Sequence, residues 1–498
     1  MEICFGKNAA PKSECPSVIW DSQKTVNGHM LLCGMSGSGK TFTLKKVINE
    51  MLGTNKEKQI RFHVFDVHGD IDIANASCVQ FSEQTNYGLN PLKVNPDPHF
   101  GGVRKRTNTF ISIINKCMRS LGEKQEAALR NILYDVYERH GFDINDHKTW
   151  NVDNANALNQ LSAEQKAKLA EPGRFYLDIP IGEKEDAKEL GRVTWEPVLK
   201  CWWCTPEDYV DNLTRWPPKV FGRSSPSLTD ALHLARNISR CSFLGSGLEA
   251  VTKLEVFHKK ARALRNKKLN FYKNDQSGTM DEKIQDDLNK AADNAVEAYT
   301  DYVGAVFSGN ELKDLMKYQS SDVMASVVNR LENLDAIGIF KSTPPPFDEK
   351  NPVWRYDLRA LGREEKKLFV LFQCEEIFEQ AFARGEQDDI VEVIILDEAH
   401  LFLENDPDNI INTISKEARK FGVALVLASQ SPTHFTEDFI SSVATKVILG
   451  IDEMYWKGAA SKMNLTAEAL AWIKLKRSIL VQIKSKEATR NNWNWTYL

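Results

Sequence analysis

Short apolar runs near both ends of the chain predict buried strands. They lie at 17–20, 29–33, 60–66, 353–358, 391–396, 423–428, 445–450 and 478–483. Between several of these runs, apolar residues recur at helical spacing, as at 42–48 and 409–420. Strands that alternate with helices in this way predict an α/β core with a mostly parallel sheet.

The middle of the chain has helical periodicity. Helices are predicted at 109–120, 124–140, 230–237, 248–272, 281–307 and 320–334. Tryptophans among prolines at 190–226 predict a compact, irregular surface elaboration. The predicted parts are a short N-terminal extension (1–28), the first part of the core (29–103), a mainly α-helical insertion (104–345), the second part of the core (346–485) and a C-terminal tail (486–498).

A complete phosphate loop of the form G-x-x-x-x-G-K-[ST] follows the strand at 29–33 and opens a helix. Backbone N–H groups of such a loop face the phosphates of a nucleotide such as ATP. Lys40 is expected to reach the β- and γ-phosphates, and the Thr41 hydroxyl to ligate Mg²⁺. The predicted nucleotide-binding residues are Gly34, Met35, Ser36, Gly37, Ser38, Gly39, Lys40, Thr41 and Phe42.

The strand at 391–396 runs directly into Asp397 and Glu398, the pattern of a Walker B motif. An acid at such a strand tip holds the metal and its water shell, and a second carboxylate orients the attacking water. We assign Asp397 to Mg²⁺ and Glu398 to the water. The simpler alternative is a pair of acids that cap a helix.

Two further residues are candidates for the same site. Gln430 ends the next strand, where an amide is able to contact the γ-phosphate or the water. Arg419 is a candidate arginine finger supplied to a neighbouring subunit. It is also placed to stabilise a helix C-terminus before the Gly422 stop, and both interpretations use the same position.

The sequence argues against two other nucleotide-dependent classes. Asp397 to His400 also spells the box of superfamily 2 helicases, but too few residues follow for a second RecA-like domain. The Leu-Ser-Gly-Gly signature of ABC and SMC proteins is not in the sequence.

Composition limits the classes of protein and the cellular compartment to be considered. The net charge of −4 argues against a histone-like binder but leaves room for a local basic channel. Nine scattered cysteines suggest a reduced, cytoplasmic protein. The sequence has no apolar run of 18 residues and its first residues lack a signal-peptide layout, so no direct membrane insertion is expected.

The ordered set of motifs resembles the HerA/FtsK superfamily of ring-forming, DNA-pumping ATPases, nearest to its HerA-like branch and the related conjugative ATPases. The phosphate loop and the Walker B pair belong to this resemblance. So do five further segments, at 66–70 (an Asp-x-His-Gly-acid turn), 87–92, 121–125, 356–361 and 419–422, and the strand end at 428–430. The resemblance covers about 30–140 and 325–485.

This resemblance implies a RecA-like P-loop NTPase core, a homo-oligomer (a hexamer), sites between subunits with Arg419 acting in trans, and double-stranded DNA in a central channel. It also implies a nuclease or other effector as partner, in bacterial defence or DNA processing. The 28 residues before the first core strand are fewer than the β-barrel domain of typical HerA proteins needs. The family turn usually ends in Glu, where this chain has Asp70.

Three features fall outside the motif set. Residues 259–268 carry six cations and no acid, and fit either a solvated helix face or a DNA path. Cys201 and Cys204 form a C-x-x-C without the second pair that a zinc site needs. His400 follows the Walker B acids and either packs there or links them to DNA sensing.

The sequence thus predicts an Mg²⁺-ATP-driven translocase on double-stranded DNA. Two alternatives stay open at this point. One is a peripheral conjugation or secretion ATPase. The other is an ATP-organised scaffold that holds an effector with slow turnover.

Overall fold

The computed structural model describes most of the 498 residues. The described residues are 1–9, 16–54, 60–151, 161–179, 183–209, 213, 216, 219, 221, 225–239, 247–274, 282–306, 316–403, 409–487 and 492–498.

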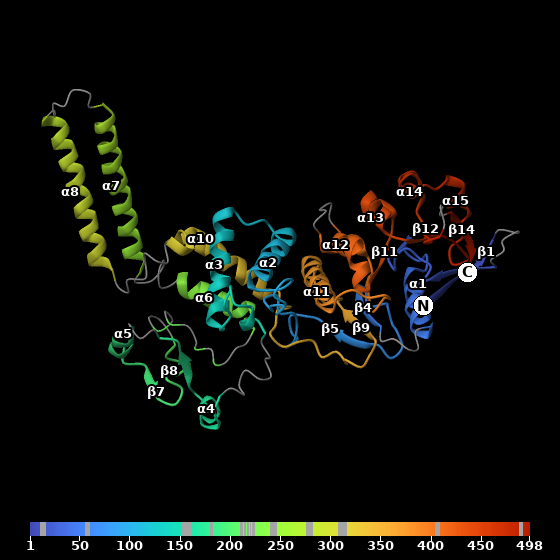
Figure 1. Cartoon of the computed structure of the whole chain (residues 1–498), viewed down its shortest axis with the longest axis horizontal. Coiled ribbons are helices and arrows are strands. Elements are labelled where there is room, and N and C mark those ends of the chain that lie inside the picture. Colours follow the sequence, from blue (N-terminus) through green and yellow to red (C-terminus); the bar gives the residue numbers. More distant parts are fainter. Residues whose placement is uncertain are drawn as a thin grey trace.

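One eleven-stranded sheet organises the molecule (Figure 1). Its strands, in spatial order, are β2 (Ser17–Asp21), β1 (Glu2–Asn8), β14 (Trp493–Tyr497), β13 (Ser478–Ile483), β12 (Thr445–Gly450), β3 (Met30–Gly34), β11 (Val423–Ser429), β10 (Glu392–Leu396), β4 (Arg61–Asp66), β9 (Val353–Asp357) and β5 (Ser77–Gln80). The seven strands from β12 to β5 are parallel. The other four join by antiparallel pairing. The predicted α/β fold with a mostly parallel sheet is confirmed.

The central parallel strands β3, β11 and β10 are largely apolar because both faces of the sheet are covered. Along β3, Leu31 and Cys33 face one hydrophobic cluster, and Met30 and Leu32 face the other. The first cluster includes α11 (Arg363–Arg384) and the second includes α1 (Lys40–Thr54). The apolar runs at 393–396 and 423–428 have the same cause.

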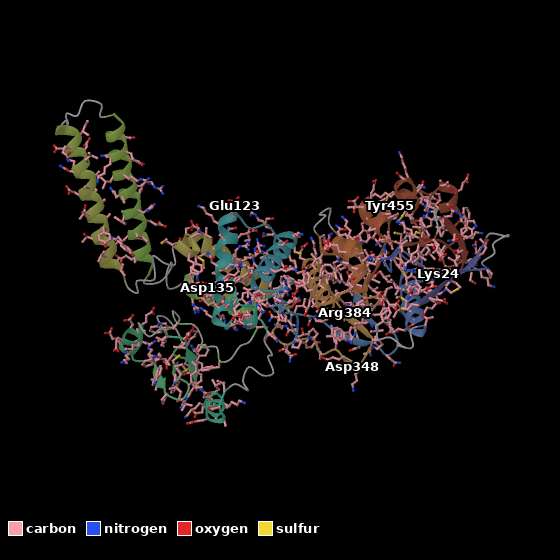
Figure 2. The ribbon with its side chains drawn as sticks, in the orientation of Figure 1. Lys24, Glu123, Asp135, Asp348, Arg384 and Tyr455 are labelled. Atoms are coloured by element: carbon pink, nitrogen blue, oxygen red, sulfur yellow. The ribbon has the colours of Figure 1, made fainter. Side chains whose placement is uncertain are left out.

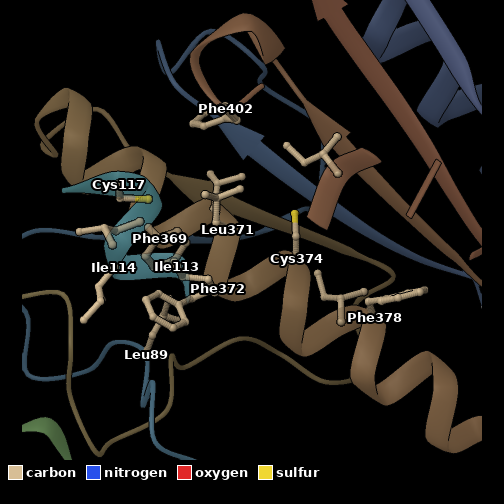
Figure 3. Packing of buried hydrophobic residues seen from close by; sticks show 14 of the residues in the cluster. Leu89, Ile113, Ile114, Cys117, Phe369, Leu371, Phe372, Cys374, Phe378 and Phe402 are labelled. Carbon is tan, nitrogen blue, oxygen red and sulfur yellow. The ribbon is translucent and has the colours of Figure 1, made fainter. Parts of the chain in front are cut away.

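Helices on the α11 side carry the first cluster outward from the sheet. They are α2 (Val103–Cys117), α3 (Glu123–Arg139), α6 (Leu228–Ile238) and α10 (Ser321–Ala336). Figure 3 shows Ile113 and Ile114 of α2 near Phe372 of α11. On the far side of α3, Asp135 accepts hydrogen bonds from Lys317 and Tyr318, which precede α10 (Figure 2). The predicted helical insertion therefore shares one continuous core with the sheet.

Two long antiparallel helices, α7 (Gly247–Asn274) and α8 (Glu282–Ala305), pack on each other and project from the rest of the molecule (Figure 1). The remaining helices are short. They are η1 (His147–Thr149), α4 (Ala163–Leu169), α5 (Lys184–Glu189), η6 (Ala399–Leu401), α12 (Ile410–Glu417), η7 (Ala418–Phe421), η8 (Pro432–His434), α13 (Glu437–Ser442), η9 (Glu453–Tyr455), α14 (Trp456–Met463) and α15 (Ala467–Trp472). Among the described residues, no helix has an apolar stretch sufficient to cross a membrane.

The stretch predicted as irregular at 190–226 instead contributes to a small antiparallel sheet. Its order is β6 (Phe175–Leu177), β8 (Cys201–Cys204) and β7 (Thr194–Glu196). Side chains alternate between the two faces of a strand, so residues three apart, such as Cys201 and Cys204, point to opposite faces. The two cysteines accordingly lie in different hydrophobic clusters. Burial raises the pKa of both thiols to about 11. This placement does not bring the pair together as ligands of one metal.

The segments predicted as an extension (1–28) and a tail (486–498) both supply strands of the main sheet, namely β1, β2 and β14. The sequence analysis missed β1 and β14, although Ile3 and Phe5 alternate with exposed residues. Gly6 permits the close approach of these two strands. It has a φ of +147°, and a Cβ there would lie 2.1 Å from the carbonyl oxygen of Tyr497.

Candidate active site

The phosphate loop forms the turn from β3 into α1, as its motif requires. Gly37 and Gly39 have φ values of +77° and +101°, a conformation that L side chains rarely adopt. A Cβ on Gly34 would lie 2.3 Å from Ser38 Oγ. The Ser38 hydroxyl is buried and has no hydrogen-bond partner within the protein. The loop is thus shaped to wrap a small anion closely, with a polar atom left to meet it.

The Lys40 side chain folds back over the phosphate loop. Its Nζ donates a hydrogen bond to the carbonyl oxygen of Gly34 at 2.9 Å. Phe42, the next residue but one, is 67 % exposed at the start of α1. Its predicted contact with a nucleotide stays a prediction.

Three carboxylates meet at the carboxyl ends of β4 and β10. Oxygens of Asp66, Asp70 and Asp397 all lie within 4.8 Å of one another. Thr41 Oγ1 donates a hydrogen bond to Asp70 Oδ2 at 3.0 Å, which brings the loop against this cluster. Asp70 was noted from the sequence as part of a turn, but neither it nor Asp66 was predicted near the metal.

Asp66 is engaged mainly in holding the turn. It accepts hydrogen bonds from the backbone N–H groups of Gly69 and Ile71 at 2.6 and 3.1 Å, and from Arg355 Nε at 2.9 Å. Asp70 and Asp397 are therefore better placed to offer oxygens outward. Hard divalent cations such as Mg²⁺ take oxygen ligands of this kind together with a threonine hydroxyl.

The electrostatics of the cluster fit a cation. Burial, followed by the nearby charges of Glu398 and Asp70, raises the pKa of Asp397 to about 6. Grouping carboxylates out of water costs free energy, and a divalent ion offsets that cost. On this chemistry, Thr41, Asp70 and Asp397 fit Mg²⁺.

Glu398 points across the strand tips toward the phosphate loop. Its Oε1 lies 3.7 Å from Lys40 Nζ, and its Oε2 lies 3.2 Å from His400 Nδ1. Burial acts to raise the pKa of Glu398, but His400, Lys40 and a hydrogen bond from Gln430 together lower it below its usual value. The backbone of Glu398 is left-handed, with φ of 48°. A non-glycine residue in this conformation is uncommon and recurs at functional sites.

Gln430 reaches Glu398 because β11 lies between β3 and β10 in the sheet. Its neighbour Ser429 contacts His434 Nδ1 through Oγ at 2.9 Å, and the rings of His434 and His400 are 5.0 Å apart. A chain of polar side chains thus surrounds the Glu398 carboxylate. The sequence analysis did not find His434, since nothing in its spacing points to the site.

Arg419 lies at the opposite end of the strands from the phosphate loop, beside their amino ends. It precedes β11, whereas Gln430 follows it, and seven strand residues span about 23 Å. Its side chain is exposed. Its charge and, more strongly, burial lower the pKa of His29 to about 4, which places Arg419 near the start of β3. The structure therefore brings together Lys40, Thr41, Asp397, Glu398 and Gln430, but not Arg419.

Arg419 also lies in the last turn of a short helix, η7, where the helix-end interpretation places it. Gly422 has a φ of +71°, and its N–H donates a hydrogen bond to the carbonyl oxygen of Arg419. This turn ends η7 and starts β11. The exposed guanidinium is not used in that turn.

Comparison with known proteins identifies the core. The family model described as "Helicase HerA, central domain" matches residues 3–180. Residues 3–180 thus resemble the central domain of HerA-type P-loop ATPases. Over 63 residues the chain is 44 % identical to the DNA double-strand break repair helicase HerA of Pyrococcus furiosus, a match that covers 12 % of this chain and 11 % of that protein. Over 78 residues it is 42 % identical to probable helicase MJECL08 of Methanocaldococcus jannaschii, covering 13 % and 15 %.

The chain matches only a small part of the length of those curated relatives. Among solved structures, VirB4 of Thermoanaerobacter pseudethanolicus has a TM-score of 0.52 and 14 % identity, and the match covers 99 % of this chain and 95 % of that one. At this identity the likeness shows the fold alone. A second family model, a domain of unknown function (DUF5710), matches residues 174–218, which contain the small β6–β8–β7 sheet.

Proposed function

We propose that this protein is an Mg²⁺-ATP-dependent motor that forms a ring and moves double-stranded DNA. The observation that carries the proposal is the meeting of the two halves of the site. Lys40 and Thr41 come from the start of the chain, and Asp397 and Glu398 from near its end, yet Glu398 and Lys40 are in contact at 3.7 Å. Such an arrangement serves phosphoryl transfer to water.

In this proposal the loop N–H groups, Ser38 and Lys40 hold the phosphates of ATP. Thr41, Asp70 and Asp397 hold Mg²⁺. The bound ion supplies positive charge beside the phosphates, where negative charge builds up during hydrolysis. Lys40 exchanges its hydrogen bond to the Gly34 carbonyl for one to the phosphates. An ammonium binds a charged phosphate oxygen more strongly than a neutral carbonyl oxygen.

Glu398 orients and polarises the attacking water. Its lowered pKa keeps it ionised near neutral pH, as an acceptor for the water's hydrogen bond must be. Gln430 holds the same carboxylate from β11 and is able to respond when the γ-phosphate leaves. His400 contacts the other oxygen and fixes the direction of the side chain.

Arg419 acts on the site of a neighbouring subunit. Two observations support this role. The Arg419 side chain is exposed, and it lies at the amino ends of the strands, too far from its own phosphate loop to contact it. An arginine supplied in trans requires a homo-oligomer, and we propose a hexameric ring.

Double-stranded DNA as the substrate is supported by the relatives, whose names describe helicases of DNA double-strand break repair. We further propose a cytoplasmic setting in defence or DNA processing, with a nuclease or other effector as partner. The matched relatives share only a short segment, so these points rest on the proposal and its test.

The test is ATP hydrolysis by the purified protein with and without linear duplex DNA, at low and moderate salt. Lys40→Ala provides the blank. We expect duplex DNA to stimulate turnover strongly, and the stimulation to weaken with salt because phosphate contacts release counterions. Turnover that ignores DNA would contradict a DNA motor.

A further inference from the structure

The α7–α8 arm, residues 247–274 and 282–306, carries a strongly basic surface that the ATPase site does not use. Over about 42 Å, α7 projects away from the helical layer and the sheet (Figure 1). Six exposed cations lie in its outer half, here called the basic ridge: Lys259, Lys260, Arg262, Arg265, Lys267 and Lys268. No acid occurs among residues 259–268.

These cations are not neutralised within the arm. Between the described parts of α7 and α8, the ion pair is that of Lys253 with Asp301 at 3.7 Å, nearer the base of the arm. Within the ridge, Lys267 Nζ reaches only the carbonyl oxygen of Asp287, at 3.5 Å, and Arg262 contacts His258. An ordinary solvated helix face carries charges of both signs, so this ridge is unusual for one.

Helix geometry explains why the acids of α8 do not reach the ridge. The buried Ala295 and Ala298 mark the side of α8 that packs on α7. At about 100° per residue, Asp286, Asp293 and Glu297 lie within about 20° of the direction opposite Ala295.

On α7 the same reasoning puts Lys259 and Arg262 outward, whereas Lys268 lies in the direction of Ala250 and Arg265 about 60° from it, and both are still exposed. The buried Ala250 and Leu254 mark its side toward α8, and Lys259 lies about 180° round from Ala250. Arg262 lies about 60° to one side of Lys259 and Lys260 about 100° to the other. The middle and outer parts of α7 therefore carry exposed cations around most of the helix, and three acids of α8 point away from it.

We propose that the basic ridge of the α7–α8 arm grips the phosphate backbone of duplex DNA. The inference rests on the proposed DNA motor and names a surface by which it would hold its substrate. A charge every ~1.7 Å along duplex DNA suits a helix with six exposed cations that form no ion pair among the described residues. The contact is to phosphates and carries no sequence preference.

The chemistry of the ridge favours duplex DNA over two other polyanions. A membrane-binding helix pairs its cations with a wide apolar face, whereas the outward positions between the ridge cations are Ala263 and Asn266. A single-strand binder offers aromatic rings on which bases stack, and residues 259–268 include none.

The test compares binding of a fluorescent blunt duplex to the full-length protein over a salt series. The ridge variant combines Lys259→Gln, Lys260→Gln, Arg262→Gln and Arg265→Gln, since glutamine keeps helix propensity without charge. The logarithmic salt slope is expected to fall by about 3.6, and affinity at moderate salt roughly tenfold or more. ATP hydrolysis without DNA and the circular dichroism spectrum should not change.

Two control variants isolate the ridge. Lys184→Gln with Lys188→Gln removes two cations of similar exposure that are paired with Glu185, and should leave the slope unchanged. Asp293→Asn with Glu297→Gln alters the opposite face of the arm and should not weaken binding. A double Lys259→Gln, Lys260→Gln variant matches the first control in charge and should lower the slope by about 2.

An unchanged salt slope in the ridge variant, with wild-type protein still bound and stimulated by duplex, would overturn the ridge and leave the motor standing. Wild-type protein that neither binds duplex nor responds to it would overturn both. Ridge-dependent binding to phosphatidylserine vesicles without duplex binding would assign the surface to a membrane instead.

Discussion

Glu398 Oε1 lies 3.7 Å from Lys40 Nζ, although β11 separates the strands that carry the two residues. The contact spans the sheet because both side chains project from the carboxyl ends of parallel strands, where open α/β sheets bind their ligands. It also holds the carboxylate ready beside the phosphate loop.

Replacing Glu398 by Gln should abolish turnover while ATP still binds. The amide keeps the shape of the side chain but is a poor acceptor for a water proton, so we expect kcat to fall roughly 100-fold or more. Affinity for a fluorescent ATP analogue should change by less than about threefold on the same reasoning. Glu386→Gln, an exposed acid before β10, is the control and should keep full activity.

The Asp397 carboxyl should link stability to pH and Mg²⁺. Its pKa in the folded protein, about 6, lies above its ordinary value of 3.8. Without metal, its stabilising contribution is therefore present below pH 3.8 and is lost as pH rises to about 6. Added Mg²⁺ should raise the melting temperature at about pH 7.5 and much less at about pH 5, because the ion competes with the proton.

Asp397→Asn tests that linkage by thermal unfolding. The variant should lose most of the Mg²⁺-dependent rise and should not be less stable than wild type without metal, since it removes like-charge repulsion. Asp388→Asn, an exposed residue before β10, should behave as wild type. If Mg²⁺ raises the melting temperature of Asp397→Asn as much as that of the wild type, this carboxyl does not bind the metal.

Arg419 should act on a neighbour's site rather than its own. Arg419→Ala alone is expected to lower turnover about 10³-fold, as for other arginine fingers. Mixed with Lys40→Ala subunits, it should recover activity, because a Lys40→Ala neighbour still offers Arg419 to an intact loop. Lys420→Ala is the matched control. If mixing restores nothing and Arg419→Ala merely lowers stability, the residue is a helix-end cation.

Gly6 should be required for the pairing of β1 with β14. Gly6→Ala places a Cβ against the carbonyl oxygen of Tyr497 at a φ of +147°, and should destabilise the protein by about 2 kcal/mol or more. Gly53→Ala in α1 meets open space, and should be neutral or stabilising by up to about 1 kcal/mol. Denaturant unfolding of the two variants provides the comparison.

Much of the core was predictable because its central strands are buried on both faces and carry apolar runs, as at 393–396. The long helices were predictable from periodicity, and α7 and α8 were located to within a few residues. β14 was missed because one face is solvated and its exposed residues include Trp495 and Tyr497, so no apolar run marks it. The sheet β6–β8–β7 was missed because its strands have only three or four residues each.

The site was predictable where a local motif carries it. Lys40, Thr41, Asp397 and Glu398 each follow a strand within a recognisable pattern. Asp70 and His434 were not assigned to it, because their places depend on how a turn and a short helix fold back over the strand tips. That Arg419 lies far from its own phosphate loop follows only from the strand order.

The most direct test of the central claim is displacement of a third strand from a triplex-bearing linear duplex. A motor that moves along duplex DNA strips the third strand without separating the duplex. We expect wild-type protein to do so with Mg²⁺ and ATP, and Glu398→Gln protein to bind the DNA but leave the triplex intact. DNA-stimulated ATP hydrolysis by wild-type protein with no displacement from either end would contradict translocation.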